Sequence, residues 1–479
     1  MPTPARNNHA SNMQIQEPRI RSPLPPSPIA FKEQQGRPPA TTQQTITGKL
    51  FRNLFKGLLF SQLTLISLLV IVLTIRGLIL ASSHHFHPKK WYPPLLASVA
   101  VSGVSSLALQ CIFIYTPSRA VRATFWLSPI LTCSVGILLV LIGSAVDAGI
   151  GAVFVLFAIT QSLYGCWITP RLEYTDKILS LSTSFPPAKT REVVTLSIVI
   201  SVVYSGFLVT GIGGATSTRT SLDLLFISLI LISLAWTMQV LKNVQQVAIS
   251  RARYVNFAYG EEMDAWSALH VTVKHLIGSI CIGSTLVPII VLIRGMIRSV
   301  NLMSGSSDEV MYSGADCFST LANKIVVCGN RWGFVHVGTY DKGFVEASSD
   351  TWKKFRSVND LEKVIDSDLT SSLCFLSAVS VGAVSSLTAG IWMLLIHKEY
   401  ALEVTLYAFI IGYYMGRVGL AWLQACVLSY YVAYSEDPQS MRFDGTVPQR
   451  IQRLQMLRAH RENREHEVGR ERQDTDESL

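Results

Sequence analysis

The stretch EVTLYAFIIGYYMGRVGLAWLQACVLSYYVAY, residues Glu403 to Tyr434, is almost entirely apolar and carries Arg417 near its middle. At about 1.5 Å per residue, a helix of this length crosses a hydrocarbon layer of about 30 Å with some tilt. Gly412, Gly416 and Gly419 fall on neighbouring helical positions. Such a strip lets another helix approach closely where lipid supplies no hydrophobic drive. The stretch therefore predicts a membrane-spanning helix packed inside a bundle.

The composition of the whole chain is that of a membrane protein. Of its 479 residues, 49% are hydrophobic and only 15% are charged, against about 25% charged in an ordinary soluble domain. Successive apolar runs of about twenty residues exclude a β-barrel, whose alternating strands are about ten residues long. We therefore expect an all-α polytopic membrane protein with about ten transmembrane helices.

Ten segments are predicted to be spans, and nine of them have the length and hydropathy expected of a span. They are Leu58–Leu80, Pro94–Tyr115, Phe125–Val146, Gly149–Thr169, Val193–Ile212, Leu222–Val244, Ala268–Ile293, Arg331–Val345, Leu373–Ile396 and Leu402–Val432. The eighth is short and is interrupted by Asp341 and Lys342. We include it because Lys and Arg cluster in both tails, which places both in the cytoplasm and requires an even number of spans.

Three regions follow from this outline. Residues 1–46 are polar and proline-rich and are predicted to be a disordered cytoplasmic tail. Residues 47–433 form the predicted ten-helix transmembrane domain, and residues 434–479 a polar cytoplasmic tail. The net charge of +9 is explained by this topology, so we expect no nucleic-acid partner.

No soluble-enzyme motif is present in the sequence. We find no Walker loop, no HExxH zinc motif and no nucleophile elbow, so we predict neither enzymatic activity nor a cofactor or metal. Cys317 and Cys328 lie in one loop, and a disulfide between them is expected only if that loop faces an oxidising compartment. The side on which residues 294–330 lie stays open.

Ionisable residues within the spans are candidates for a substrate path, because charge inside a bilayer is costly and usually faces a cavity or a partner. Lys274 and His275 lie in the seventh span, Asp341 in the eighth and Arg417 in the tenth. For Lys274 the alternative is that it reaches the membrane interface with its long side chain. The sequence favours neither interpretation.

Aromatic residues accompany these charges, and aromatic faces attract bound cations such as quaternary ammonium groups. The candidate substrate-binding residues are Tyr407, Tyr413, Tyr414, Trp236, Trp332 and Tyr340. Each ring also fits an interfacial belt or ordinary helix packing. The pattern thus predicts an aromatic-lined cavity only if several of these rings meet.

Three stretches resemble the choline transporter-like family. They are GSICIGS at Gly278–Ser284; Asn330 and Arg331 with Phe334, Val335, Val337, Gly338, Tyr340 and Phe344; and Gly412 and Met415 running into Glu436, Asp437 and Pro438. Asp341 replaces a glycine that is frequent in the family, and the loop Ala81–Pro93 is short. The chain is therefore similar to the shorter plant and fungal branch.

The resemblance implies a secondary transporter in the plasma membrane, with lipids around it and choline or a related organic cation as its substrate. Relatives are uniporters or proton exchangers that have no ATP-binding domain. Two rival functions remain. One is a non-transporting membrane organiser that recruits trafficking partners through its tails. The other is a lipid scramblase, which requires a polar groove open to lipid.

Overall fold

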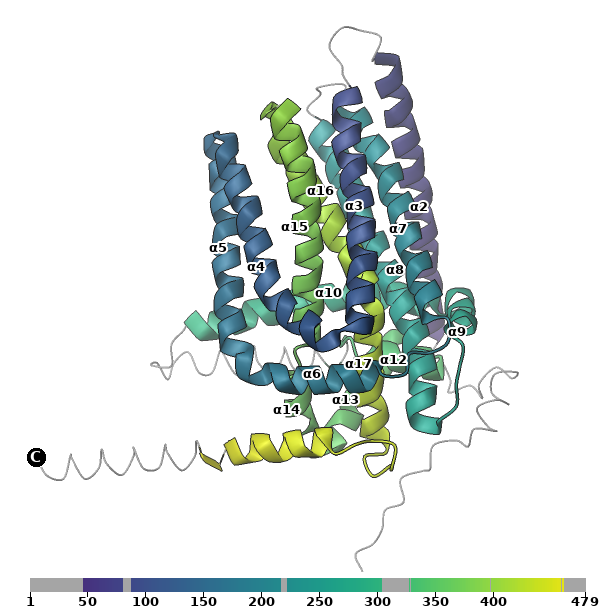
Figure 1. Ribbon diagram of the computed structural model, residues 1–479. Helices are drawn as coiled ribbons and strands as arrows, with labels where there is room; N and C mark the ends of the chain where they lie inside the picture. The colour runs from purple at the N-terminus through teal and green to yellow at the C-terminus, as the bar shows by residue number, and fades with distance from the viewer. Residues whose placement is uncertain are drawn as a thin grey trace, which may run out of the picture. The chain divides into compact units, whose positions relative to one another are not determined.

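The computed structural model describes residues 46–80, 88–216, 222–303, 327, 329–396, 398–457 and 459–460. Within these ranges the regular structure is helical (Figure 1). The long helices are α2 (Ile46–Leu80), α3 (Pro88–Tyr115), α4 (Pro117–Ile142), α5 (Ala145–Ile168), α7 (Thr190–Thr216), α8 (Asp223–Tyr259), α10 (Ile277–Met303), α15 (Thr370–Ile396), α16 (Ala401–Gly419) and α17 (Ala421–Glu436). Shorter helices are η1 (Thr169–Arg171), α6 (Leu172–Thr183), α9 (Ala265–Val271), η2 (Thr272–Leu276), α12 (Gly333–Tyr340), α13 (Phe344–Ser357), α14 (Leu361–Asp366) and η3 (Lys398–Tyr400).

The predicted fold class is confirmed. By length and composition, eight helices of the described part could cross a membrane, and up to nine if the bent pair α16 and α17 counts as one span. The N-terminal end of α2 and the C-terminal end of α17 lie at the same end of the bundle, beside the short helices α6, α12, α13 and α14 (Figure 1). This placement agrees with tails on one side of the membrane. Residues 1–45 of the predicted tail 1–46 and the end of the C-terminal tail lie outside the described residues.

The prediction that Arg331–Val345 is the eighth span is wrong. Helix α12 is 8 residues long, about 12 Å, and so is too short to cross a hydrocarbon layer of about 30 Å. It ends because Asp341 adopts a left-handed backbone conformation with φ of 53°, a conformation typical of helix ends. The polar helix α13 follows after Gly343.

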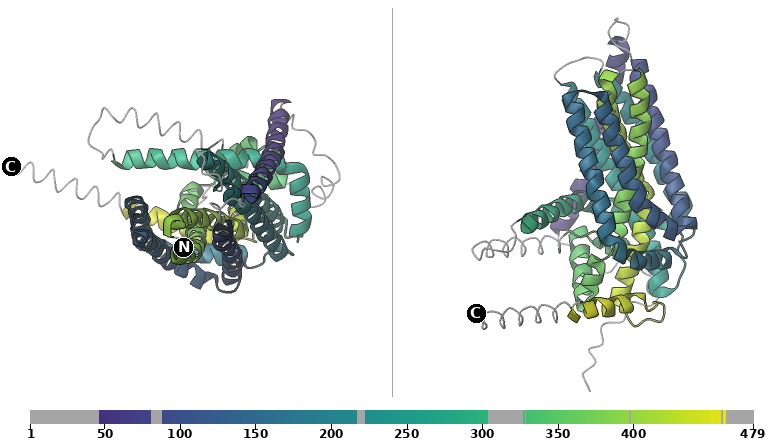
Figure 2. Two further views of the ribbon diagram at one scale, coloured as in Figure 1. Left: turned by 90° about the horizontal axis from the view of Figure 1, so that it is seen from above. Right: turned by 60° about the vertical axis from the view of Figure 1, so that its left-hand side comes forward.

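Helix α10 differs from its neighbours in direction. The continuous segment Ala265–Ile293 has the length and composition of a span, but α10 lies across the direction of the long helices (Figures 1 and 2). It packs closely on α2, since a Cβ added to Gly278 would lie 2.4 Å from the backbone oxygen of Arg52. The small residues of this segment therefore serve helix packing.

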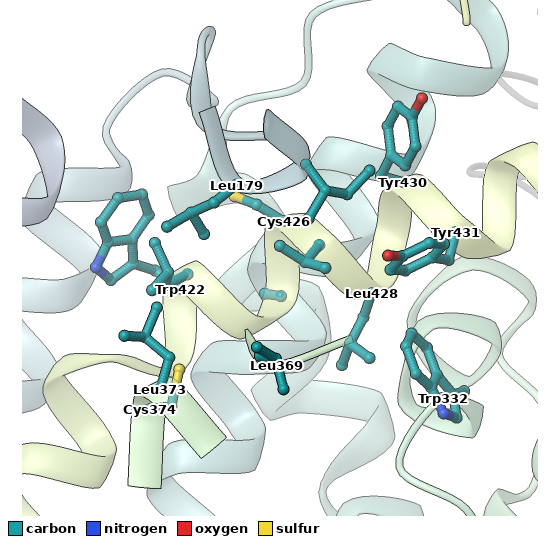
Figure 3. Packing of buried hydrophobic residues seen from close by; sticks show 14 of the residues in the cluster. Leu179, Trp332, Leu369, Leu373, Cys374, Trp422, Cys426, Leu428, Tyr430 and Tyr431 are labelled. Atoms are coloured by element: carbon teal, nitrogen blue, oxygen red, sulfur yellow. The ribbon is translucent and has the colours of Figure 1, made fainter. Parts of the chain in front are cut away.

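The glycine strip of α16 packs against α15 as the sequence predicts. A Cβ added to Gly412 would lie 2.9 Å from the Cα of Gly382, and one added to Gly416 would lie 2.9 Å from the Cα of Ala378. Below this contact, α17 is surrounded by a buried core. Its members include Leu179, Trp332, Leu369, Leu373, Cys374, Trp422, Cys426, Leu428, Tyr430 and Tyr431 (Figure 3).

Candidate functional site: buried polar groups of α8, α12 and α17

The second half of α8 is polar and nevertheless buried. Apolar residues fill the first half of this 37-residue helix, which at about 1.5 Å per residue is longer than a hydrocarbon layer. The buried polar residues that follow are at most 6% exposed and comprise Lys242, Asn243, Gln245, Gln246, Ser250, Arg251 and Arg253. Burial of so many polar groups is costly unless each finds a partner.

The helix opposite this run is broken. Helices α16 and α17 are bent by 43° at Leu420, whose φ of −101° and ψ of 4° lie outside the helical range. The Sγ atom of Cys374 in α15 lies 3.9 Å from the backbone oxygen of Leu420. A helix interrupted at membrane depth is tolerated where protein or water satisfies its free backbone groups.

Positive charges gather at this break. The charges of Arg331 and Arg417 act on Lys242, and all three act on Cys374. Arg331 donates a hydrogen bond to Ser371. Lys242, 6% exposed, has no hydrogen-bond acceptor or carboxylate partner within the part of the chain that the structure describes. A buried amino group without a partner is expensive.

Unpartnered polar atoms lie on helices α8 and α17. Buried atoms without a hydrogen-bond partner include Asn243 Oδ1, both side-chain amide atoms of Gln245 and of Gln246, Trp422 Nε1 and Gln424 Oε1. Most buried polar atoms in folded proteins bond to protein or ordered water. The concentration of these atoms on α8 and α17 marks the region of the bundle most suited to water or a polar solute.

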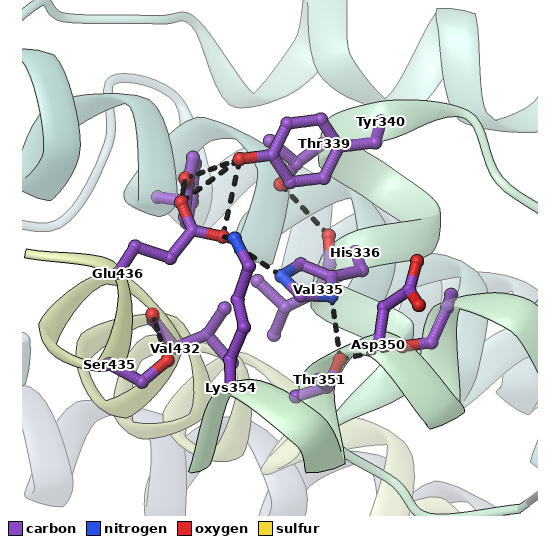
Figure 4. Close-up of polar contacts among 12 residues, drawn as sticks. Val335, His336, Thr339, Tyr340, Asp350, Thr351, Lys354, Val432, Ser435 and Glu436 are labelled. Carbon is purple, nitrogen blue, oxygen red and sulfur yellow. Dashed lines mark hydrogen bonds and ion pairs between the residues drawn. The ribbon is translucent and has the colours of Figure 1, made fainter. Parts of the chain in front are cut away.

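A connected network closes the end of this region (Figure 4). Glu436, the last residue of α17, is 9% exposed, and its Oε1 atom lies 3.1 Å from His336 Nε2. Its carboxylate also accepts hydrogen bonds from Lys354 and Tyr254, and from the Tyr340 hydroxyl at 3.0 Å. Four elements, α8, α12, α13 and α17, therefore converge on one carboxylate.

The residues around Glu436 are themselves held in place. The Nδ1 atom of His336 lies 2.7 Å from Thr351 Oγ1, and the Tyr254 and Tyr340 hydroxyls are 2.9 Å apart. Burial, with a smaller effect of the Glu436 charge, raises the pKa of Tyr340 above its ordinary value. Tyr340 therefore remains a neutral donor to the carboxylate.

The predicted aromatic residues fall into three packing clusters. Tyr407 and Tyr414 pack beside a core that includes α2, α3 and α7, and the Tyr414 ring lies 5.2 Å from that of Tyr413. Trp236 donates to Thr285 at 3.2 Å and packs beside a second core. Trp332 and Tyr340 belong with a third core. The structure does not bring all six rings together, and their role in substrate binding stays a prediction.

The predicted polar residues also have different surroundings. Lys274 and His275 lie in the π-helical segment η2 with exposed side chains. Asp341 pairs with Arg251 at 3.2 Å. Arg417 lies in the last turn before the helix break. Cys317 and Cys328 lie outside the described residues.

Sequence reasoning did not single out several residues of the site. They are Lys242, Gln245, Gln246, Tyr254, His336, Lys354 and Gln424, and Glu436 was noted only for its resemblance to the family. For α8 a signal existed, because the polar run continues an apolar helix without any turn residue. No comparable local signal marked the pairing of His336 and Lys354 with Glu436.

A separate pocket lies between α4, α5 and α6. Its volume is about 570 Å³, and its lining includes Arg122, Phe125, Trp126, Glu173 and Asp176. Trp126 is 70% exposed, and Asp176 Oδ1 has no hydrogen-bond partner. The pocket combines charge of both signs with aromatic surface at one flank of the bundle.

A bundle of apolar helices, eight or nine of which could span a bilayer in the described part of the chain, defines the class of polytopic α-helical membrane proteins. The sequence comparison narrows this class. The profile of the family described as "Plasma-membrane choline transporter" matches residues 152–439, which include α8, α12, α17 and Glu436. The chain belongs to this family, which the sequence resemblance predicted.

Fungal proteins are among the curated relatives of the chain. It is 23% identical over 254 residues to Protein PNS1 of Mycosarcoma maydis, covering 50% of this chain and 48% of the relative. It is 25% identical over 218 residues to Protein PNS1 of Debaryomyces hansenii, covering 42% of each chain. With protein pns1 of Aspergillus fumigatus it is 24% identical over 174 residues, covering 34% of this chain and 32% of the relative. The chain thus matches about half of their length or less.

Proposed function

We propose that this protein is a secondary transporter that carries choline or a related organic cation across the plasma membrane. The observation that carries the proposal is the Glu436 carboxylate. It is 9% exposed, bonded to two tyrosine hydroxyls, and already paired with the ammonium group of Lys354. A carboxylate beside aromatic rings is the chemistry that recognises an organic ammonium. Family membership supports the same class of substrate.

The substrate path is proposed to follow α8 and α17. It leads from the unpartnered amides of Gln245 and Gln246 and the unpartnered Oε1 atom of Gln424 toward Glu436. Between these levels the two helices are in contact, because Ser429 Oγ donates to the Ser250 backbone oxygen at 3.1 Å. Passage of a solute therefore requires the helices to separate. The break at Leu420 is a suitable hinge, since discontinuous helices commonly form the moving parts of transporters.

Uptake of labelled choline into proteoliposomes tests the proposal. The substitution Glu436→Gln keeps the shape of the side chain but removes the charge, and we expect it to abolish saturable uptake. Glu362→Gln is the matched control, because Glu362 is 39% exposed and pairs only loosely with Arg356, at 3.7 Å. Wild-type uptake by Glu436→Gln would contradict the assignment of the site. Fluorescence microscopy of the tagged protein in cells tests whether it lies in the plasma membrane.

Lipid scrambling is a second candidate, favoured by the pocket between α4, α5 and α6. Arg122 suits a lipid phosphate, while Trp126 and Asp176 suit the ammonium of a choline headgroup. A scramblase should equilibrate fluorescent phosphatidylcholine between leaflets of the same proteoliposomes, as measured by dithionite bleaching. Trp126→Ala should slow that exchange. Choline uptake without any lipid exchange would favour the transporter.

A further inference from the structure

The contacts of Glu436 are of two kinds. His336, Tyr254 and Tyr340 come from α12 and α8 and form a mostly buried cup around the carboxylate. The fourth partner is the ammonium of Lys354, which comes from α13. The Lys354 side chain is 40% exposed, whereas that of Glu436 is 9% exposed. The cup is thus mostly buried, whereas its cation is carried by a long side chain that reaches water.

The Lys354 ammonium also contacts an aromatic ring. Its Nζ atom lies 5.7 Å from the centroid of the Tyr340 ring, within the range of a cation–π interaction. Lys342 Nζ lies 6.0 Å from the same centroid, but Lys342 is engaged by Asp350 at 2.5 Å. Lys354 alone, among the described lysines, combines the Tyr340 ring with the Glu436 carboxylate.

We propose that Lys354 is a tethered competitor of the substrate, whose ammonium occupies the binding place of the solute's ammonium at Glu436 and Tyr340. The proposal rests on the proposed function, in which Glu436 binds the cation. Exchange leaves no buried charge unpaired, because the solute replaces Lys354 at the carboxylate while Lys354 moves into water. Lys354 thereby lowers the apparent affinity of the empty site and closes it when no solute is bound.

The substitution Lys354→Met tests this role, because it keeps the length of the side chain and removes the charge. We expect the KM for choline uptake to fall by about two- to fivefold, the range for losing a partly exposed ion pair. The choline-induced rise in Tm should grow in parallel. Lys353→Met is the matched control on the same helix, since Lys353 is 75% exposed and lies 3.9 Å from Asp350. An unchanged or higher KM in Lys354→Met relative to the control would overturn the proposal.

A second variant covers the case in which Lys354→Met does not fold. Arginine keeps the charge and binds carboxylates with a planar fork, so Lys354→Arg should raise the KM for choline. Wild-type KM values in both variants, with normal uptake, would overturn the competitor while leaving the transporter intact. Absence of uptake in the wild type, together with a larger choline-induced Tm shift in Lys354→Met, would overturn transport and support the site.

Discussion

The Nε2 atom of His336 lies 3.1 Å from Oε1 of Glu436, although 100 positions separate the two residues in the chain. This contact ties α12, a helix too short to span the membrane, to the end of α17. It orients the Glu436 carboxylate toward Tyr340 and Lys354. The end of the segment that the family profile matches, residues 152–439, is thereby connected to Arg331–Val345, which the sequence predicted to be a span.

The hydroxyl of Thr351 is expected to hold His336 in this orientation. Thr351→Val removes the partner of His336 Nδ1, at 2.7 Å, inside a buried region. The loss of a buried hydrogen bond should destabilise the protein by about 1–3 kcal/mol, seen as a lower Tm in detergent. Thr388→Val is the control, because Thr388 bonds only within its own helix. Equal Tm values for the two variants would contradict this role.

The Tyr340 hydroxyl joins Glu436 to Tyr254. Tyr340→Phe keeps the ring and removes hydrogen bonds of 3.0 and 2.9 Å, so choline uptake should fall severalfold while the cation–π contact remains. The measurement is the KM for choline in proteoliposomes. Tyr164→Phe, which loses a 2.8 Å hydrogen bond to Ser372, controls for the general loss of a hydroxyl. Wild-type KM in Tyr340→Phe would exclude the hydroxyl from binding.

Lys242 is expected to cost stability. It is 6% exposed, is repelled by the nearby charges of Arg331 and Arg417, and has no carboxylate partner in the described residues. Replacing a buried polar group that has no partner by an apolar side chain of similar length removes a desolvation penalty of about 1–3 kcal/mol, so Lys242→Met should raise the Tm. Lys363 is 48% exposed and pairs with Asp360 at the surface, so the control Lys363→Met should change stability by less than about 1 kcal/mol.

A higher Tm with lower choline uptake in Lys242→Met would show that the unpaired charge serves transport. A lower Tm would contradict the view that Lys242 is an uncompensated charge. Both quantities are measured on the same purified sample, so loss of folded protein is separated from loss of activity.

Two glycines should respond in opposite directions to the same substitution. Gly416→Ala places a Cβ 2.9 Å from the Cα of Ala378, and the strain should cost about 1–3 kcal/mol. Gly57→Ala meets nothing within 4 Å and should be neutral or stabilising by up to about 1 kcal/mol, because alanine favours helix. Expression level and Tm of the two variants check the sign of each effect.

The sequence by itself determined the helical membrane fold, the close packing of α16, and the family. Insertion into a bilayer depends on local hydropathy over about twenty residues, and the glycine strip at Gly412 and Gly416 is equally local. The resemblance depended on residues that could be compared without knowing their neighbours in space. The interruption of the eighth segment by Asp341 and Lys342 was visible in the sequence, but the count of positive charges in the two tails outweighed it, and α12 ends after 8 residues.

Only the tertiary structure decided which polar groups meet. Glu436 lies 82 positions from Lys354 and 182 from Tyr254 in the chain, and hydropathy carries no information on which helices become neighbours. The tertiary structure also shows that the candidate rings of Trp236, Trp332 and Tyr407 pack into different clusters. In a bilayer the pairing of helices depends on side-chain packing and hydrogen bonds between them, and these form only when the whole bundle is assembled.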